Sequence, residues 1–316
     1  MKYIEDFQED ENIVGHYLCK KRESLKSRSG KTYLSLKLQD KTGKIDAKVW
    51  ELNNNIQSFE ENDFIKIDAV VLTYQNSLQL KVSKIRKSQP GEYNEADFIP
   101  STNKNVDVLY EEILTIIKSI NNVYIKKLLE NIFIDNSDIT SNIKTHSAAK
   151  LMHHSYMGGL IEHLVSVAQI CDFMSTRYKF VNRDILVAGA LLHDLGKIYE
   201  LSAFPDNNYT DDGELLGHIV IGTELLTSEA SKIEGFPKQL LSLMKHCIIS
   251  HHGELEYGSP QLPKTIEAFI LHSADDVDAK VKMYEEMMEK DNGKNNWVGY
   301  HHMLKRNIRK SEFDEK

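Results

Sequence analysis

Apolar and polar residues alternate with a period of two over much of the first quarter of the chain. The alternation is clearest in two runs on either side of Asp40-Lys41-Thr42-Gly43, a strong tight-turn signal. The apolar positions of these runs are Leu34, Leu36, Leu38, Ile45, Ala47 and Val49. Successive side chains of a strand point to opposite faces, so this pattern predicts two strands with one buried face.

Five strands are predicted in this region. They cover residues 13–19, 33–39, 45–50, 64–74 and 78–82, with a hairpin tip at Gln75-Asn76. The basic, serine-rich stretch at 20–31 is expected to be a loop between the first two strands. Five short strands in about 80 residues predict a small closed barrel.

The pattern becomes helical after a stretch rich in Gly, Pro, Asn and Ser at 88–105, which we interpret as a linker. From Val106 onward apolar residues recur at helical spacing. Further helices are predicted at 122–133, 146–154, 158–178, 182–200, 214–231, 237–252 and 263–290, and the last fifteen residues are expected to fray. The chain thus divides into a barrel at 1–87, a linker at 88–105 and a helical domain at 106–316, with its core at about 146–290.

Composition favours a soluble two-domain protein. The chain has 316 residues, 41% hydrophobic and 27% charged, with a net charge of −8. Its three cysteines are odd in number and form no CxxC pair, which favours a reducing cytosol. Neither an apolar signal core nor a membrane-spanning apolar run is evident, so we expect a cytoplasmic protein with no membrane partner.

A local concentration of positive charge offsets the acidic total. Residues 20–31 hold six basic residues and one acid; the basic ones are Lys20, Lys21, Arg22, Lys26, Arg28 and Lys31. The predicted strands also carry the aromatic residues Tyr33, Trp50 and Phe64. Trp50 has the opposite parity to Val49, which predicts exposure, whereas Phe64 is expected in the core. Basic residues beside exposed aromatics suit a single nucleic-acid strand. The alternative is a solvated loop with the aromatics in the core.

Candidate metal ligands are dispersed along the helical region. They are His163, His193, Asp194, His218, His251 and Asp275, with His252 as a further candidate. A buried histidine or aspartate is costly without a partner, and Asp194 can bridge two cations through its two oxygens. Imidazole and carboxylate donors suit Mn, Fe, Co, Ni or Zn, and the absence of cysteine argues against structural zinc. Any one histidine alone is more simply a hydrogen-bonded core residue.

Three further residues extend this candidate site. Lys197 follows His193 by one helical turn, where its ammonium can neutralise charge on a phosphoryl oxygen. The alternative is a solvated lysine near a helix start. His153 and His154 are weaker candidates for the mouth of the site.

These motifs resemble the HD phosphohydrolase superfamily. The resemblance is carried by His163, His193-Asp194-Leu195-Gly196-Lys197, the glycine-flanked His218, His251-His252 and Asp275. The segment 258–268, which begins Gly-Ser-Pro, is similar to the bacterial YhaM-type exoribonucleases, in which an OB-fold precedes the HD domain. The resemblance implies an α+β multidomain chain with a five-stranded OB-fold barrel before an all-α HD bundle. Three-metal HD proteins carry a carboxylate at the position of Gly159, so two metals are implied here.

The resemblance also implies a function. It predicts a metal-dependent 3′-to-5′ exonuclease that uses two divalent ions, with manganese favoured. Asp194 and Lys197 would be the catalytic residues. The substrate would be single-stranded RNA, and the products would be nucleoside 5′-monophosphates. The protein would assemble as a homo-oligomer. The sequence leaves open single-stranded DNA as a substrate, the native metal and the subunit number. Two alternatives are a nucleotide or cyclic-nucleotide phosphohydrolase and a non-catalytic single-strand DNA-binding replication factor.

Overall fold

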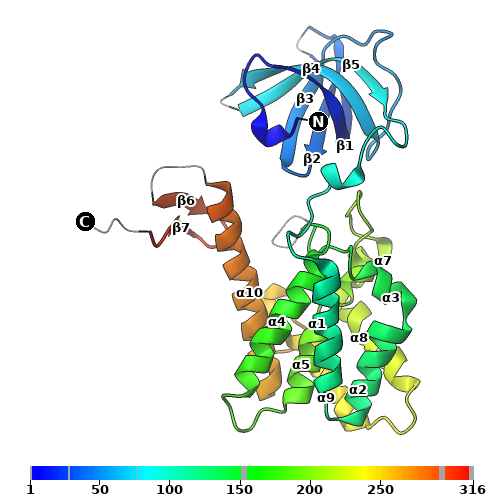
Figure 1. Cartoon of the computed structure of the whole chain (residues 1–316), viewed down its shortest axis with the longest axis vertical. Helices are drawn as coiled ribbons and strands as arrows, with labels where there is room; N and C mark the ends of the chain where they lie inside the picture. Colours follow the sequence, from blue (N-terminus) through cyan, green and yellow to red (C-terminus); the bar gives the residue numbers. More distant parts are fainter. Residues whose placement is uncertain (1, 28, 76, 151–154, 292–295, 313–316) are drawn as a thin grey trace. The chain divides into compact units, whose positions relative to one another are not determined.

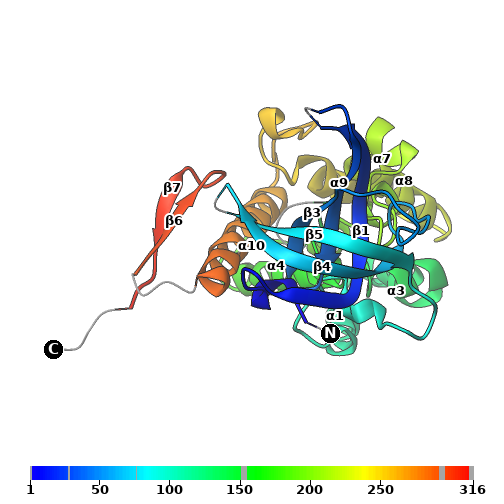
Figure 2. The same cartoon turned by 90° about the horizontal axis from the view of Figure 1, so that it is seen from above.

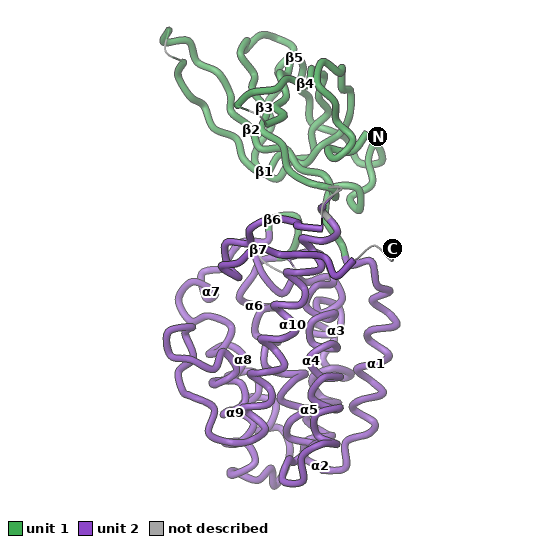
Figure 3. The backbone as a smooth tube through the Cα atoms, turned by 90° about the vertical axis from the view of Figure 1, so that its left-hand side faces the viewer, with its two compact units in different colours: residues 1–101, 203–206 green, residues 102–202, 207–316 purple. Residues whose placement is uncertain are grey.

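A computed structural model describes residues 2–27, 29–75, 77–150, 155–291 and 296–312. The chain forms two compact units, Met1–Ser101 with Ala203–Asp206, and Thr102–Ser202 with Asn207–Lys316 (Figures 1 and 3). Arg28, His153 and His154, and residue 76 of the predicted hairpin tip, lie outside the described residues.

The first unit is a closed barrel with the strand order β1-β2-β3-β5-β4, which confirms the predicted five-stranded barrel (Figure 2). Its strands are β1 (Asn12–Lys26), β2 (Thr32–Asp40), β3 (Gly43–Val49), β4 (Phe64–Tyr74) and β5 (Ser77–Lys87). Neighbouring strands are antiparallel except β3 and β5, whose parallel pairing completes the barrel.

The barrel core follows the alternation of the sequence. All six apolar positions of the two alternating runs are buried. The turn between these strands is held by the buried Asp40, whose Oδ1 accepts hydrogen bonds from the backbone N–H groups of Thr42 at 2.8 Å and Gly43 at 3.1 Å. Trp50 is 42% exposed, as its parity predicts.

The prediction of a loop at 20–31 is wrong. Strand β1 continues to Lys26 and pairs with β2 from Lys21 opposite Lys37 to Lys26 opposite Thr32, which leaves only residues 27–31 between the strands. Serine and lysine favour loops, but a paired neighbouring strand satisfies the backbone N–H and C=O groups and overrides that preference. The basic side chains therefore project from an extended hairpin.

Residues after β5 complete the first unit. A short helix η2 (Glu95–Asp97) precedes Phe98 and Ile99, whose side chains are buried. Gln39 Nε2 donates a hydrogen bond of 3.0 Å to the carbonyl of Phe98. Phe64 is only partly buried and stacks on Tyr93 with ring centroids 4.3 Å apart, so it belongs to an aromatic cluster rather than to the barrel core.

The second unit is helical, as predicted, with one added hairpin. Its main helices are α1 (Val106–Ser119), α2 (Val123–Glu130), α3 (Ser137–Asn142), α4 (Gly159–Ser175), α5 (Arg183–Leu192), α6 (Lys197–Glu200), α7 (Asp211–Leu215), α8 (Gly217–Ser231), α9 (Lys238–Ser250) and α10 (Ile266–Lys290). The most apolar of them, α4 and α5, lie side by side in the core, and α10 contacts both (Figure 1). Among the described helices, none is long and apolar enough to cross a membrane.

Three predictions in this unit are wrong. Residues 146–150 form no helix, and the helix expected at 182–200 is interrupted by a turn at 193–196. Strand β7 (Arg306–Arg309) lies within the last fifteen residues, where fraying was expected, and pairs antiparallel with β6 (Trp297–His301). Leu304 and Ile308 of this hairpin are buried, which gives it an apolar side beside the charged residues Lys305, Arg306 and Arg309.

Candidate active site

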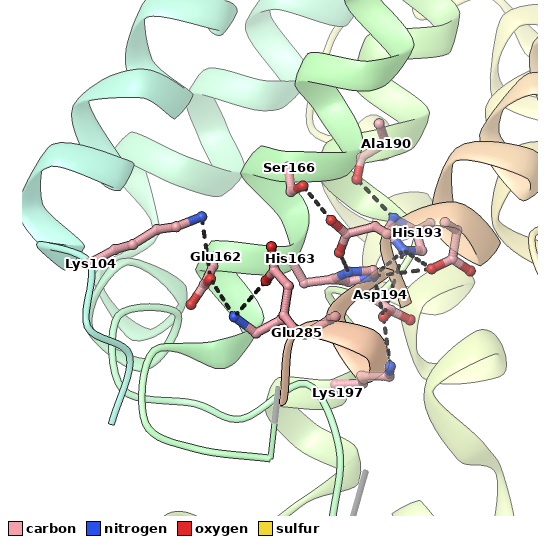
Figure 4. Close-up of polar contacts among 12 residues, drawn as sticks. Lys104, Glu162, His163, Ser166, Ala190, His193, Asp194, Lys197 and Glu285 are labelled. Carbon is pink, nitrogen blue, oxygen red and sulfur yellow. Dashed lines mark hydrogen bonds and ion pairs between the residues drawn. The ribbon is translucent and has the colours of Figure 1, made fainter. Parts of the chain in front are cut away.

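Side chains from five segments meet in the second unit around Asp194, and Figure 4 shows His163, His193 and Lys197 beside it. His193 and Asp194 lie in the turn that separates α5 from α6. The other contributors are His163 on α4, His218 at the start of α8, His251 directly after α9 and Asp275 on α10. The turn that breaks the predicted helix therefore places the two adjacent residues at the centre of the cluster.

The two carboxylate oxygens of Asp194 face two different pairs of histidines. Its Oδ2 lies 3.5 Å from His163 Nε2 and 3.6 Å from His193 Nε2. Its Oδ1 lies 3.4 Å from His218 Nε2 and 3.5 Å from His251 Nε2. One carboxylate is therefore placed to share two cations, each with its own imidazole donors.

Asp275 joins the first of these pairs. Its Oδ1 lies 3.1 Å from His163 Nε2 and 3.8 Å from His193 Nε2. Asp275 Oδ1 therefore adds a second oxygen donor to the group formed by His163, His193 and Asp194 Oδ2. The mixture of nitrogen and oxygen donors matches the set preferred by first-row divalent metals.

Backbone carbonyls fix the tautomers of two histidines. The Nδ1–H of His193 donates to the carbonyl of Ala190 at 2.8 Å, and that of His251 donates to the carbonyl of Ile248 at 2.6 Å. A carbonyl can only accept, so Nδ1 must carry the proton and Nε2 presents its lone pair to Asp194. Both rings are thus set as metal donors by their own helices.

Two carboxylates outside the cluster hold the other rings, and sequence reasoning missed both. Asp278 Oδ2 lies 2.8 Å from His163 Nδ1, and its Oδ1 accepts a hydrogen bond from Ser166. Glu200 Oε1 lies 2.9 Å from His218 Nδ1. Carboxylates behind metal-binding histidines orient the ring and increase its basicity. The sequence signal for Asp278 was its spacing from Asp275, which it follows by one helical turn.

Several donor atoms of the cluster lack partners. Among the described residues, buried atoms without a hydrogen bond include Asp194 Oδ1, His218 Nε2, His251 Nε2 and His252 Nδ1. An unpartnered buried polar atom is costly, so four in one place need a common partner. A divalent cation bound by His218, His251 and His252 beside Asp194 would satisfy them, so these residues fit a metal.

The electrostatics of the cluster agree with this fit. Burial lowers the pKa of His193 to about 4 and the pKa of His252 to about 4, so both imidazoles are neutral near pH 7, as metal ligation requires. Burial alone would raise the pKa of Asp194, but Lys197 and the surrounding histidines together outweigh burial and hold that pKa well below the ordinary value. Asp194 is therefore ionised and can accept cations.

Lys197 occupies the position predicted for it. Its Nζ lies 2.6 Å from Asp194 Oδ2. Burial lowers the pKa of Lys197, but the charge of Asp194, the hydrogen bond to it and the nearby charges of Asp275 and Glu200 together outweigh burial, so the pKa lies above its ordinary value. A fixed ammonium group beside the central carboxylate can stabilise negative charge that develops on a phosphoryl oxygen.

Glycines permit the close contacts between the segments of the site. A Cβ at Gly196 would lie 2.1 Å from the carbonyl oxygen of His218 and 2.8 Å from the backbone nitrogen of Gly222. A Cβ at Gly253, which has a φ of +80°, would lie 2.2 Å from the ring of His272. The glycine of the His193–Lys197 motif therefore lets α8 approach the turn and bring His218 to Asp194.

A cavity of about 580 Å³ opens beside the cluster. His163, Asp194, Lys197, His251 and Asp275 form part of its wall. Ligand cavities in proteins commonly have volumes of this order. The donor atoms are therefore accessible to a substrate of nucleotide size.

The candidate nucleic-acid residues lie on the barrel. Tyr33 and Trp50 stack on each other, with ring centroids 4.6 Å apart and an interplanar angle of 25°. Lys21, Lys26 and Lys31 are exposed. Lys20 is half-buried and donates to Asn62 Oδ1 at 3.0 Å, and Arg22 lies over the ring of Phe59. Among these candidates, the exposed lysines and the Tyr33–Trp50 pair are therefore the ones accessible to a nucleic-acid strand.

Comparison with known proteins agrees with the fold and the site. Residues 160–280 match the HD domain family, and residues 19–87 match a family described as an OB-fold nucleic acid binding domain. The chain is thus an HD-domain hydrolase with an OB-fold before the HD domain.

Curated relatives identify the family more closely. A protein named 3′-5′ exoribonuclease YhaM from Geobacillus sp. (strain WCH70) is 33% identical over 291 residues, covering 92% of this chain and 89% of the relative. The proteins of the same name from Shouchella clausii and Listeria welshimeri are 33% and 31% identical, covering 92% and 91% of this chain and 90% and 91% of their own lengths. The chain belongs to the YhaM family.

Proposed function

We propose that this protein is a metal-dependent 3′-to-5′ exonuclease that hydrolyses single-stranded RNA and releases nucleoside 5′-monophosphates. The observation that carries the proposal is the position of Asp194, whose two oxygens each face a separate pair of imidazole nitrogens. The printed names of the relatives, 3′-5′ exoribonuclease, support the substrate and the direction.

The proposed cofactor is a pair of divalent ions, with manganese as the first candidate and iron, cobalt, nickel and zinc as others. One ion would be held by His163, His193, Asp275 and Asp194 Oδ2. The other would be held by Asp194 Oδ1 with the remaining donors, His218, His251 and His252. Bound there, the ions supply an activated water and neutralise charge on the phosphate.

The protein's own groups would orient the reaction. Asp278 and Glu200 keep the rings of His163 and His218 in place, so the donor set is arranged before substrate arrives. Lys197 offers its ammonium to a non-bridging phosphate oxygen. Water attacks phosphorus, the P–O3′ bond breaks and O3′ takes a proton, which leaves the phosphate on the 5′ oxygen of the released nucleotide.

The barrel would hold the strand whose end is cleaved. Tyr33 and Trp50 would provide a stacking surface, and the basic stretch at 20–31 would provide positive charge through Lys20, Lys21, Arg22, Lys26, Arg28 and Lys31. We assign strand binding to residues 1–87 and hydrolysis to the helical core at about 146–290, joined through 88–105. A cytoplasmic homo-oligomer is part of the same proposal, on the strength of the family resemblance.

The proposal is tested with metal-stripped protein and a 5′-labelled single-stranded RNA. Mn²⁺, Mg²⁺, Zn²⁺ or no metal is added back, and Asp194→Ala and a DNA strand of the same sequence serve as controls. A ladder that shortens from the 3′ end, requires metal and is lost in the variant supports the proposal. An intact strand under every condition contradicts it, and mononucleotides would then be tested as substrates.

A further inference from the structure

The cavity beside the His/Asp cluster is larger than the cluster, and much of its remaining wall is apolar. We define the apolar wall as Tyr257, Ala279, Met283, Met303 and Leu304, all of which line this cavity. These residues come from three segments: the short helix η4 (Leu255–Tyr257), α10 and the turn between β6 and β7. The hydrolytic mechanism described above uses none of them.

Helix α10 connects the cluster to the apolar wall. Asp275, Ala279 and Met283 follow one another at intervals of four residues and therefore lie in order along one side of the helix. At the helical rise of 1.5 Å per residue, Met283 lies about 12 Å along the axis from Asp275. A phosphate beside Asp275 would thus have its sugar near the small Ala279 and its base near Met283.

The hairpin turn completes the wall from the other side. Leu304 is buried and its N–H donates a hydrogen bond of 3.2 Å to His301 Nδ1, which braces the turn. Met303, next to it, is 53% exposed, and Tyr257 is 65% exposed. The wall thus offers a thioether and an aromatic ring that a flat ligand can cover.

We propose that the apolar wall is the subsite for the nucleobase of the 3′-terminal nucleotide, an inference that rests on the proposed exonuclease function. Thioether sulfur makes favourable contacts with aromatic rings, and an aromatic side chain stacks on any base. The methionine, leucine and alanine side chains offer no hydrogen-bond donor that distinguishes one base edge from another, and the Tyr257 hydroxyl can both donate and accept. The subsite therefore accepts all four bases, as an enzyme that shortens a strand residue by residue requires.

The test compares two 5′-labelled RNAs that differ only at the 3′ end, where one carries an ordinary nucleotide and the other an abasic ribose. For the wild-type protein we expect kcat/KM to be about tenfold lower on the abasic strand, since the stacking contact is lost. Met283→Ala and Met303→Ala should lower kcat/KM on the ordinary strand and bring the ratio between the strands close to one. Strands with different terminal bases should be cleaved at similar rates.

Matched variants separate the subsite from general effects on folding. Met288→Ala changes a methionine of the same helix that lies outside this cavity and should keep the wild-type ratio. Met303→Leu keeps an apolar side chain and should restore most of the discrimination. A wild-type ratio of one, or a wild-type ratio retained in both alanine variants, would overturn the inference. Failure of the wild-type protein to shorten the ordinary strand with any metal would instead overturn the proposed function.

Discussion

The His/Asp cluster of the helical unit and the basic hairpin of the barrel differ in how their side chains are held. In the cluster, His163, His193 and Asp194 are almost fully buried and each ring is fixed by a second hydrogen bond. On the hairpin, Lys21, Lys26 and Lys31 are exposed. A site that positions reacting atoms needs geometry fixed in advance, whereas a surface that holds a variable strand needs charge and stacking area. Changes in the cluster should therefore lower kcat, and changes on the barrel should raise KM.

The largest effect is expected from Asp194→Asn. The amide keeps the size of the side chain but removes the charge that faces both histidine pairs. Several kcal/mol of transition-state stabilisation should be lost, so kcat should fall by about three orders of magnitude. Single-turnover cleavage of labelled RNA measures this. A fall of less than tenfold in a folded, metal-loaded variant would contradict a central role for this carboxylate.

Lys197→Ala should lower kcat by about a hundredfold, because one fixed charge at the phosphate is lost. Metal content should stay near the wild-type value, since the ammonium is not a ligand. Lys232→Ala, which removes an exposed ammonium paired with Glu229 elsewhere in the unit, is the matched control. If the two variants cleave RNA at equal rates, Lys197 has a structural role and no catalytic one.

Asp278→Asn tests the carboxylate behind His163. We expect a loss of about 10- to 100-fold in metal affinity or activity, the range for carboxylates that orient metal-binding histidines. Because the ligands themselves remain, added Mn²⁺ should recover much of the rate. Glu285→Gln, on the exposed face of the same helix, should behave as wild type. If Mn²⁺ fails to recover activity in a folded Asp278→Asn protein, the positioning role is wrong.

Trp50→Ala on the barrel should have the smallest effect. Loss of one stacking platform costs about 1–3 kcal/mol of strand binding, so KM for long RNA should rise while kcat stays unchanged. Trp297→Ala, which removes a more exposed tryptophan on the β6–β7 hairpin, controls for loss of an indole from the surface. The salt dependence of RNA binding adds a second measure. If Lys21 or Lys31 contacts a phosphate, each should contribute about one unit to the slope of log binding constant against log salt concentration.

Local pattern was enough to predict most of the fold. Alternation around Val49 correctly separated the buried face of the barrel from the exposed Trp50. The prediction failed where a distant partner decides the structure, as at Lys21–Lys26, which β2 pairs into a strand. Strand β7 was missed because it is only four residues long and has a single buried residue, Ile308, within a charge-rich stretch.

In the candidate site, too, some residues could be predicted from local sequence and others only from the tertiary structure. The six central residues of the cluster have distinctive chemistry in an apolar setting, and the structure brings them together. The spacing of Asp278 after Asp275 places it near the cluster, but the roles of Asp278 and Glu200 follow only from their distances to His163 and His218. The turn at 193–196 was also hidden, because Leu195 and Ile198 continue the apolar helical spacing of α5 from Leu192. The glycine contact between Gly196 and α8, which requires the turn, is a tertiary feature.

The central claim is that Asp194 joins two metal sites, and the direct measurement is Mn²⁺ binding to metal-stripped protein followed by electron paramagnetic resonance. The account predicts two ions per chain with a spectrum broadened by exchange coupling, and one uncoupled ion in His218→Ala. A single uncoupled ion in the wild-type protein at saturation, or no binding, would contradict it.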